Sequence, residues 1–283
     1  MNKAILQRFD LDGRTAVITG GGGALCGAMA DALGAMGVKV AVLDISQEKA
    51  EIRAQAVTQA GGTARGYACD VLDAVQLRNC YEAITALWGP PDLLINGAGG
   101  NDPRGSTSAE FEEPVKHGAT TQSFFDLDPA GFRHVFELNF MGTFLTTQTF
   151  ARAMVAKGRG SIVNISSMSA FMPLTKVAAY SAAKAAVSNF TQWLAVHFSH
   201  AGVRVNALAP GFFMTEQLRF LHIDANTGEL LPRARQVIAH TPMGRYGQPD
   251  DLIGALVWLL SDASSFVTGV VVPIDGGFSS YSI

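Results

Sequence analysis

The chain has 283 residues, 48% of them hydrophobic, and a formal net charge of -3 at pH 7. This composition provides enough apolar side chains for a packed core, and the scattered charges exclude a basic stripe for nucleic acid and an acidic tail. No apolar stretch of signal-peptide length stands at the N-terminus, and the longest later apolar run, residues 252–260, is too short to cross a bilayer. We therefore expect a cytoplasmic protein whose partners are small molecules or copies of itself.

Short β-rich runs alternate along the chain with segments of helical length. Several runs are almost wholly apolar, as is typical of strands buried on both faces of a parallel sheet. The strongest helical pattern covers residues 178–199, where apolar residues recur at steps of three and four. This order predicts a doubly wound α/β fold in one domain, residues 1–283, with a seven-stranded parallel sheet and helices on both faces. The expected strands are residues 15–19, 39–43, 64–68, 92–95, 160–165, 203–208 and 269–272.

Two long segments interrupt this alternation and lack strong periodicity, residues 99–128 and residues 212–249. Each follows an expected strand, so each leaves from the carboxyl edge of the sheet, where open α/β folds bind their ligands. We expect these segments to be substrate loops.

Cysteine and histidine residues give no sign of a metal centre. Cys26, Cys69 and Cys80 fit neither a metal-ligand spacing nor a disulfide framework, so we interpret them as packing residues. His197 and His200 lie three residues apart but have no third ligand at a useful spacing. We expect no bound metal.

The stretch TGGGGALCG begins at Thr19, directly after the first expected strand, and leads into a helical segment at residues 24–36. There, N–H groups at a helix start can bind a pyrophosphate, and glycines remove the Cβ atoms that would block its approach. A plain glycine-rich turn is the alternative. Asp44 favours the nucleotide, because a carboxylate at the end of the second strand can accept both hydroxyls of an adenosine ribose. It would also repel a ribose 2′-phosphate, so the predicted cofactor is NAD rather than NADP.

Tyr180 and Lys184 lie four residues apart on the strongest helical segment, so their side chains share one face. A nearby ammonium and a positive nicotinamide ring would favour the phenolate and make Tyr180 a usable general base. Ser167, at the end of a strand, can hold a substrate oxygen beside the phenol. Taken alone, the residues leave open an ordinary surface Tyr–Lys pair and a serine that makes a local turn bond.

These motifs, with others in the same order, resemble the short-chain dehydrogenase/reductase family over nearly the whole chain. The chain departs from the family pattern where Ala24 and Cys26 replace the second and third glycines of the loop. Neither side chain is large, so we expect a slightly shifted loop and some change in cofactor affinity. The matching residues are Thr19 to Cys26, Asp70, Asn96 to Gly99, Asn139, Ser167, Tyr180, Lys184, Pro210, Gly211 and Asp275 to Gly277.

The resemblance implies an NAD(P)-dependent oxidoreductase with a Rossmann fold. Lys184 would also hold the nicotinamide ribose, and Asn139 would order a water chain for the proton. It further implies a homodimer or homotetramer paired through helices at residues 129–157 and 178–199. The implied catalytic residues are Asn139, Ser167, Tyr180 and Lys184. The implied cofactor-binding residues are Gly20, Gly22, Gly23, Ala24, Leu25, Asp44, Asp70, Val71, Asn96, Ala98, Gly99, Tyr180, Lys184, Pro210, Gly211, Phe213 and Thr215.

The loop sequences are similar to a subgroup of this family assigned to D-mannonate oxidation and D-fructuronate reduction. A gluconate 5-dehydrogenase-like enzyme, or another polyol dehydrogenase or ketone reductase, is an alternative, and a non-catalytic NAD sensor is a third. The candidate substrate residues are Asn101, Arg104, Ser167, Ser169, Lys176 and Tyr180. Further loop cations that could hold a carboxylate are Lys116, Arg219, Arg233 and Arg235, and further hydroxyl-binding groups are Ser106, Thr107, Thr121 and Gln122.

Overall fold

The computed structural model describes residues 3–112, 122–215, 222–224 and 227–282. Its centre is a seven-stranded sheet with the order β3-β2-β1-β4-β5-β6-β7, in which every neighbouring pair is parallel. This confirms the predicted doubly wound α/β fold of the Rossmann type. The strands are β1 (Thr15–Thr19), β2 (Lys39–Asp44), β3 (Thr63–Ala68), β4 (Leu93–Asn96), β5 (Gly160–Ile165), β6 (Val203–Pro210) and β7 (Val271–Ile274).

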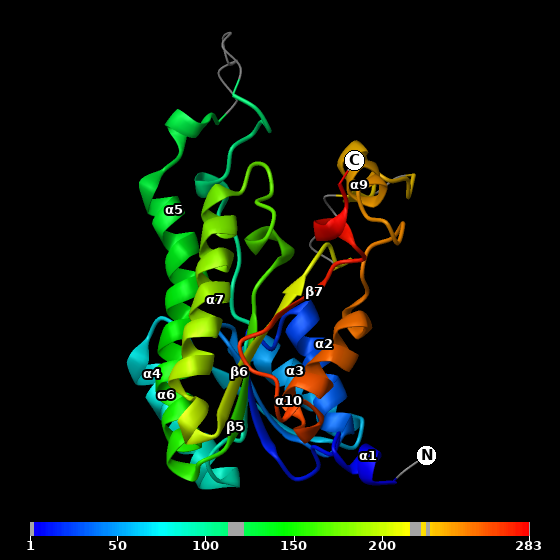
Figure 1. Ribbon diagram of the computed structural model, residues 1–283. Helices are drawn as coiled ribbons and strands as arrows, with labels where there is room; N and C mark the ends of the chain where they lie inside the picture. Colours follow the sequence, from blue (N-terminus) through cyan, green and yellow to red (C-terminus); the bar gives the residue numbers. More distant parts are fainter. Residues whose placement is uncertain (1–2, 113–121, 216–221, 225–226, 283) are drawn as a thin grey trace.

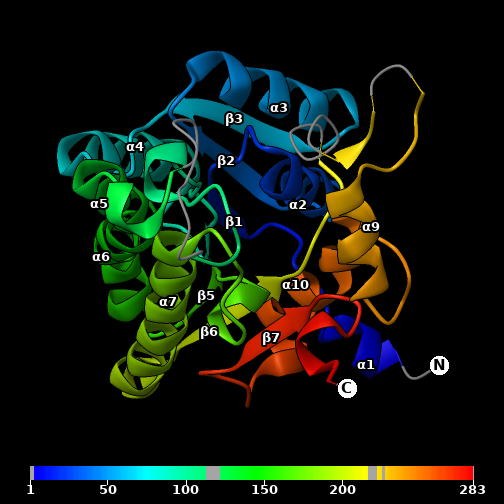
Figure 2. The ribbon, with the colours of Figure 1, turned by 90° about the horizontal axis from the view of Figure 1, so that it is seen from above.

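Helices cover both faces of the sheet, because each parallel connection must cross over one face. In Figures 1 and 2, α4 to α7 lie on one side of the sheet, and α2, α3 and α10 lie on the other. A buried apolar cluster fills each interface, with Met29 and Leu256 on one side and Leu77 and Phe150 on the other. The helices are α1 (Lys3–Gln7), α2 (Ala24–Ala35), α3 (Gln47–Gln59), α4 (Ala74–Trp88), α5 (Pro129–Phe136), α6 (Gly142–Lys157), α7 (Ala178–His197), α9 (Pro232–Ala239) and α10 (Ile253–Leu260).

None of the helices in these described segments combines the length and the apolar character needed to cross a bilayer.

The structure differs from the sequence-based expectation in three elements. The helix expected over residues 129–157 is divided into α5 and α6 by a π-helical turn, Glu137–Met141. The second expected loop contains α9, whose eight residues make only about two turns and so give no clear period. β7 begins two residues later than expected, at Val271, after Gly269 with a φ of 79°.

The three cysteines are free and buried, which confirms that they are packing residues.

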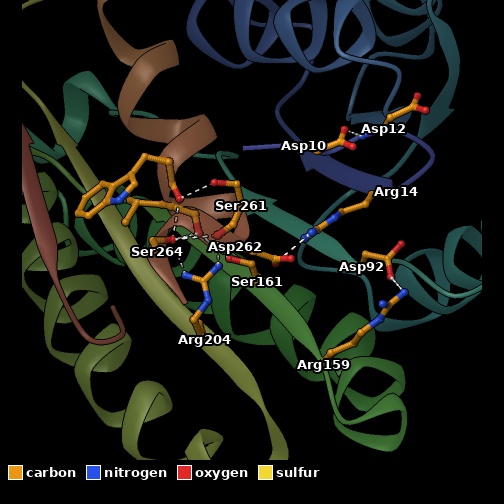
Figure 3. Close-up of polar contacts among 12 residues, drawn as sticks. Asp10, Asp12, Arg14, Asp92, Arg159, Ser161, Arg204, Ser261, Asp262 and Ser264 are labelled. Carbon is orange, nitrogen blue, oxygen red and sulfur yellow. Dashed lines mark hydrogen bonds and ion pairs between the residues drawn. The ribbon is translucent and has the colours of Figure 1, made fainter. Parts of the chain in front are cut away.

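Polar side chains gather at the amino edge of the sheet, where β1, β4, β5 and β6 begin (Figure 3). Arg204, near the start of β6, donates to Ser264 Oγ at 2.9 Å. It also donates to the main-chain oxygens of Ser261 and Val267, at 3.0 and 3.3 Å. This arginine therefore ties β6 to the connection between α10 and β7.

Ion pairs reinforce the same edge (Figure 3). Arg14 pairs with Asp262 at 3.0 Å, which links the start of β1 to the connection after α10. Asp92, just before β4, lies 3.6 Å from Arg159. Asp92 also pairs with Lys157. Arg14, Lys157 and Arg159 at this edge thus lie against carboxylates.

Candidate active site

The glycine-rich loop after β1 forms a closely packed turn at the carboxyl edge of the sheet. Gly20 has a φ of 65°, and a Cβ there would come within 3.0 Å of the main chain of Ala98. A Cβ on Gly22 would lie 2.9 Å from Asp44 Oδ2. α2 then begins without a side-chain cap, so its first N–H groups can bind an anion. The loop therefore fits the pyrophosphate of a dinucleotide.

Asp44 lies beside this loop with both oxygens fixed by the main chain. Oδ2 accepts a hydrogen bond from Gly22 N at 3.1 Å, and Oδ1 accepts one from Ser46 N at 3.0 Å. Each carboxylate oxygen can accept a further hydrogen bond, so the ribose hydroxyls of NAD fit here. The neighbouring Ile45 is exposed and brings no positive charge that would attract a 2′-phosphate.

Cys26, one of the two departures from the expected glycine pattern, packs between α2 and the end of β4. A Cβ on Gly97 would clash with Cys26 Sγ, so the thiol occupies the space that this glycine leaves. Thr19 Oγ1 holds the same segment, because it accepts from the N–H groups of Gly97 and Ala98 at 3.0 and 3.1 Å. Burial raises the pKa of Cys26 to about 12, as expected for a packing thiol.

Ser167, Tyr180 and Lys184 come together where β5 ends and α7 begins. The Ser167 side chain lies close enough to Tyr180 to lower the pKa of the phenol. Lys184 Nζ lies 5.6 Å from the centre of the Tyr180 ring and donates to the main-chain oxygen of Ile165 at 2.8 Å. The spacing of four residues on α7 thus places the ammonium beside the phenol, as the sequence predicted.

The titration behaviour of this pair is dominated by burial. Burial raises the pKa of Tyr180, and the Ser167 side chain acts in the opposite direction. Burial also lowers the pKa of Lys184 to about 8, with the Cys26 thiol opposing it. In the protein alone, desolvation of Tyr180 therefore outweighs the effects that favour the phenolate, and the prediction that the ammonium and the nicotinamide ring together make Tyr180 a usable base stays a prediction.

Asn139 is fully buried in the π-helical turn between α5 and α6. Its Nδ2 donates to the main-chain oxygens of Gly100 and Val135 at 2.7 and 2.8 Å. A Cβ on Gly99 would lie 2.5 Å from Asn139 Oδ1 and 3.3 Å from Lys184 Nζ. The turn therefore brings the amide and the ammonium to the same point of the loop after β4, as π-turns at functional sites often do.

Comparisons with known proteins decide the family. A short-chain dehydrogenase model described as enoyl-(acyl carrier protein) reductase matches residues 23–279. The uncharacterized oxidoreductase UxuB of Bacillus subtilis is 51% identical over 274 residues, which covers 96% of this chain and 97% of the relative. The chain belongs to the short-chain dehydrogenase/reductase family. It is an NAD(P)-dependent oxidoreductase.

Solved structures of other short-chain dehydrogenases/reductases share its architecture. A crystal structure of a candidate D-mannonate oxidoreductase from Haemophilus influenzae, with bound NAD, has a TM-score of 0.92 and 46% identity, and the match covers 96% of this chain and 97% of that one. A gluconate 5-dehydrogenase from Burkholderia cenocepacia J2315, in complex with NADP and tartrate, has a TM-score of 0.82 and 32% identity, and the match covers 98% and 99%. The expected nicotinamide dinucleotide cofactor is confirmed.

Asn96 and Phe213, two of the predicted cofactor residues, have buried side chains that contact other parts of the protein. Asn96 Nδ2 donates to Thr147 Oγ1 at 2.9 Å and to Asn164 Oδ1 at 2.8 Å. Phe213 is buried, and its ring fills the space over Gly247. Asn96 and Phe213 therefore offer mainly their main chain to a dinucleotide. The other predicted cofactor residues lie in segments at the carboxyl edge, namely Gly23, Ala24, Leu25, Asp70, Val71, Ala98, Gly99, Pro210, Gly211 and Thr215.

Arg104 and Asn101, both predicted substrate residues, make contacts within the first substrate loop. Arg104 donates to both carboxylate oxygens of Asp102, at 2.6 Å for the shortest bond, and lies 3.6 Å from Asp128. The pair lowers the pKa of Asp102 to about 2. Asn101 Nδ2 donates to Ser106 Oγ at 2.9 Å. The charge of Arg104 is therefore compensated before any substrate binds.

The predicted hydroxyl-binding groups of this loop also bond within it. Thr107 Oγ1 donates to the main-chain oxygen of Ala109 at 2.8 Å. Gln122 Nε2 donates to the main-chain oxygens of Pro103, Arg104 and Ser106, at 2.9 to 3.2 Å. Three predicted residues, Lys116, Thr121 and Arg219, lie outside the described residues.

Ser169 and Lys176 lie between Ser167 and Tyr180, and each has a side-chain group that is available to a substrate. Ser169 is buried, and its Oγ has no hydrogen-bond partner among the described residues. Lys176 has a φ of 73°, a strained value for a residue with a side chain, and its main-chain oxygen accepts from Thr107 N at 2.9 Å. Within the same described segments, no carboxylate pairs with Lys176. Both remain predicted substrate residues.

The sequence analysis missed a contact between the two substrate loops. Arg233 Nη1 donates to Glu110 Oε1 at 2.6 Å, and the two residues are 123 positions apart. No local pattern could have revealed this pair, because each partner looks like a solvated loop charge. Nearby, His222 Nδ1 and Tyr246 Oη form a buried hydrogen bond of 2.7 Å.

Among the described residues, no group of three or more His, Cys, Asp or Glu side chains is arranged to hold a metal ion.

Proposed function

We propose that this enzyme interconverts a secondary alcohol and a ketone on a sugar acid, with D-mannonate and D-fructuronate as the pair and NAD as the preferred cofactor. The observation that carries the proposal is the placement of Ser167 and Lys184 around the Tyr180 phenol, with Lys184 Nζ 5.6 Å from the centre of its ring. The similarity to the candidate D-mannonate oxidoreductase from Haemophilus influenzae supports the choice of substrate. Residues 99–128 and 212–249 are the substrate loops of one cofactor-binding domain.

Each residue of the site has a distinct task. Ser167 holds the substrate oxygen, and Tyr180 accepts its proton in oxidation or donates it in reduction. Lys184 supplies a buried positive charge that stabilises the phenolate when it forms, because charges interact strongly where water is excluded. Asn139 fixes the loop after β4 against the same ammonium. Bound NAD accepts the hydride from the alcohol carbon.

Polar loops at the carboxyl edge support a polyhydroxylated acid as the substrate. A steroid or an acyl chain would need a continuous apolar funnel, whereas the first loop carries serine, threonine and asparagine side chains, among them Asn101, Ser106 and Thr107, which hydrogen-bond within the loop in the absence of substrate. Phe171, Met172, Phe212 and Met214 add apolar walls, which also exclude water around a hydride transfer.

The test is a set of initial rates with NAD and with NADP, for aldonates and their matched neutral polyols. We expect reduced-nicotinamide absorbance to appear with D-mannonate and NAD, and the neutral polyol to react at least about tenfold less efficiently. Equal rates with the polyol would contradict a carboxylate site. NAD binding with no turnover of any substrate would instead indicate a sensor.

A gluconate-type acid is the second candidate substrate, favoured by the likeness to the gluconate 5-dehydrogenase from Burkholderia cenocepacia. D-gluconate and D-mannonate are both polyhydroxylated carboxylates, so one cation could hold either. A kcat/KM for D-gluconate above that for D-mannonate would replace the first assignment with this one.

We also propose that the chain forms a homodimer or homotetramer through α5, α6 and α7. An aromatic row crosses the outside of these helices, in which Phe140 and Phe190 lie 5.6 Å apart and Trp193 stacks on Phe190 at 6.1 Å. Trp193 is 55% exposed and Val196 is 77% exposed, which supports a partner on this face. A monomer in light scattering at micromolar concentration would contradict the proposal.

A further inference from the structure

A cavity of about 470 Å³ lies between the two substrate loops, in the volume range of small-molecule sites. One wall is formed by residues 172–175, which belong to the connection between Ser167 and Tyr180. Other walls come from α9 and from Phe212, which follows β6. The connection that joins Ser167 to Tyr180 is therefore also a wall of this cavity, which makes the cavity the candidate space for the part of the substrate that does not react.

Arg233, in the first turn of α9, is the arginine that lines this cavity. Its Nη1 donates to Glu110 Oε1 at 2.6 Å and to Gln236 Oε1 at 3.1 Å. Over the described part of the chain, Nε and Nη2 of Arg233 have no hydrogen-bond partner. These two groups form the edge of a guanidinium that binds a carboxylate through two parallel hydrogen bonds.

Arg233 is paired with a carboxylate, Glu110, as the other arginines of the substrate loops are with theirs, but it differs from them because it lines this cavity. After burial, its positive charge is the next cause that lowers the pKa of His222. The pairs that do not line the cavity are Arg104 with Asp102, Arg235 with Glu229 at 3.8 Å, and Arg245 with Asp251 at 2.7 Å.

We propose that Arg233 binds the carboxylate of the substrate through Nε and Nη2. Glu110 is a positioning residue, which holds the guanidinium from the opposite loop by its Nη1. The inference rests on the proposed sugar-acid function and deepens it. It makes the contact between the loops part of substrate recognition, because Glu110 on the first loop and Gln236 on α9 together hold the guanidinium.

The experiment measures binding rather than turnover. D-mannonate, D-gluconate and neutral D-mannitol are titrated by calorimetry into the full-length chain saturated with NADH. The variants are Arg233→Gln, Arg233→Lys and, as a matched control on the same helix, Arg235→Gln. Thermal melting of each variant checks its folding, and Arg233→Lys provides a folded variant with the charge retained if Arg233→Gln does not fold.

We expect Arg233→Gln to weaken binding of both aldonates at least about tenfold and to leave mannitol unchanged. Arg233→Lys should bind aldonates with an affinity between those of the wild type and Arg233→Gln, because a lysine keeps the charge but lacks the paired donors. Arg235→Gln should bind like the wild type. Glu110→Gln should tighten aldonate binding a few-fold, because it retains an acceptor oxygen for Nη1 but removes a negative charge near the ligand.

The proposal is overturned if Arg233→Gln binds aldonates as tightly as the wild type, or if the wild type binds no aldonate. A further variant, Lys176→Gln, tests the other candidate cation. Loss of aldonate binding in Lys176→Gln but not in Arg233→Gln would also overturn the proposal. Its failure differs from that of the proposed function. Aldonates that bind through Arg233 but are never oxidised would support this inference and contradict the function. Aldonates that are oxidised equally well by Arg233→Gln would support the function and overturn the inference.

Discussion

The two edges of one parallel sheet use polar side chains in opposite ways. At the amino edge, Arg204 gives its donors to Ser264, Ser261 and Val267 (Figure 3). At the carboxyl edge, Lys184 is more deeply buried than Arg204, but its Nζ donates to a single described acceptor, the main-chain oxygen of Ile165. The first arrangement holds elements together, whereas the second leaves hydrogen-bonding capacity for a ligand.

Backbone geometry differs between the edges in the residues that carry side chains. The π-helical turn at Asn139 and the left-handed Lys176 lie toward the carboxyl edge, whereas the positive φ values before the strands, at the amino edge, belong to glycines. Such features cost conformational energy and persist where the surrounding structure enforces them. The two edges show how a structural polar residue differs from a functional one in this fold. A structural residue has its hydrogen-bond partners inside the protein, whereas a functional residue keeps donors or acceptors for a ligand. The predictions below test each edge in turn.

The largest effect is expected from Tyr180→Phe at the carboxyl edge. Loss of one hydroxyl should reduce kcat by at least about 100-fold, because general acid and base catalysis contributes that much, while NADH binding stays nearly intact. Steady-state rates and NADH fluorescence titration measure the two effects. The matched control is Tyr67→Phe on β3, whose hydroxyl is buried without a hydrogen-bond partner among the described residues. A Tyr180→Phe enzyme with wild-type kcat would remove Tyr180 from the mechanism.

At the amino edge, Arg204→Met should lower stability and spare the chemistry. Removal of the guanidinium deletes three hydrogen bonds that tie β6 to the connection before β7, while Ser261 and Val267 keep other donors, so we expect the free energy of unfolding to fall by about 2 kcal/mol. Urea unfolding gives this value, and kcat of the folded enzyme should not change. Arg159→Met is the control, since the Arg159 side chain is 71% exposed and its 3.6 Å contact with Asp92 should contribute about 0 to 1 kcal/mol. Equal destabilisation by both variants would contradict the account.

Much of the carboxyl edge of the sheet could be predicted from sequence, because its residues follow short-range patterns. Neighbouring positions reveal the step of four residues from Tyr180 to Lys184, and they also reveal the glycine loop before α2. The fold follows from apolar strand runs for the same reason. The pairing of Arg233 with Glu110 depends instead on where two long loops pack, and loop packing leaves no period in the sequence.

Asp44→Ala should produce a smaller effect, confined to the choice of cofactor. Loss of the carboxylate removes acceptors for the ribose hydroxyls and the repulsion of a 2′-phosphate, so kcat/KM for NAD should fall roughly tenfold. The kcat/KM for NADP should rise, so the preference for NAD over NADP should become smaller. Glu48→Ala on the neighbouring α3 is the control. If the wild-type enzyme already used both cofactors equally, the assignment of Asp44 would be wrong.

The smallest effect is expected for Cys26→Gly, which restores the family's glycine. Loss of the contact with Gly97 and a glycine in α2 should lower the free energy of unfolding by about 1 kcal/mol, with activity kept and NAD affinity changed only modestly. With a pKa of about 12, the thiol should resist alkylation with or without NAD. Rapid labelling that NAD suppresses would show that Cys26 lies on the cofactor surface.

Ala24 and Cys26 illustrate what the sequence could not settle about this loop. From sequence, both positions were departures from a glycine pattern with a shifted loop as the expected result. The structure shows a steric reason for Cys26, because Gly97 after β4 leaves room for the sulfur. The two positions are far apart in the chain, so only the folded sheet brings them together.

The pH dependence of the two reaction directions tests the central claim, that Tyr180 exchanges the proton, most directly. Oxidation needs the phenolate, and burial raises the pKa of Tyr180, so kcat/KM for oxidation should still increase as the pH is raised above neutrality. Reduction needs the phenol, so its kcat/KM should be level near neutrality and decline only at alkaline pH. Both profiles should lose this opposite dependence in Tyr180→Phe. Profiles that change in the same direction, or an unchanged opposition in Tyr180→Phe, would contradict the account.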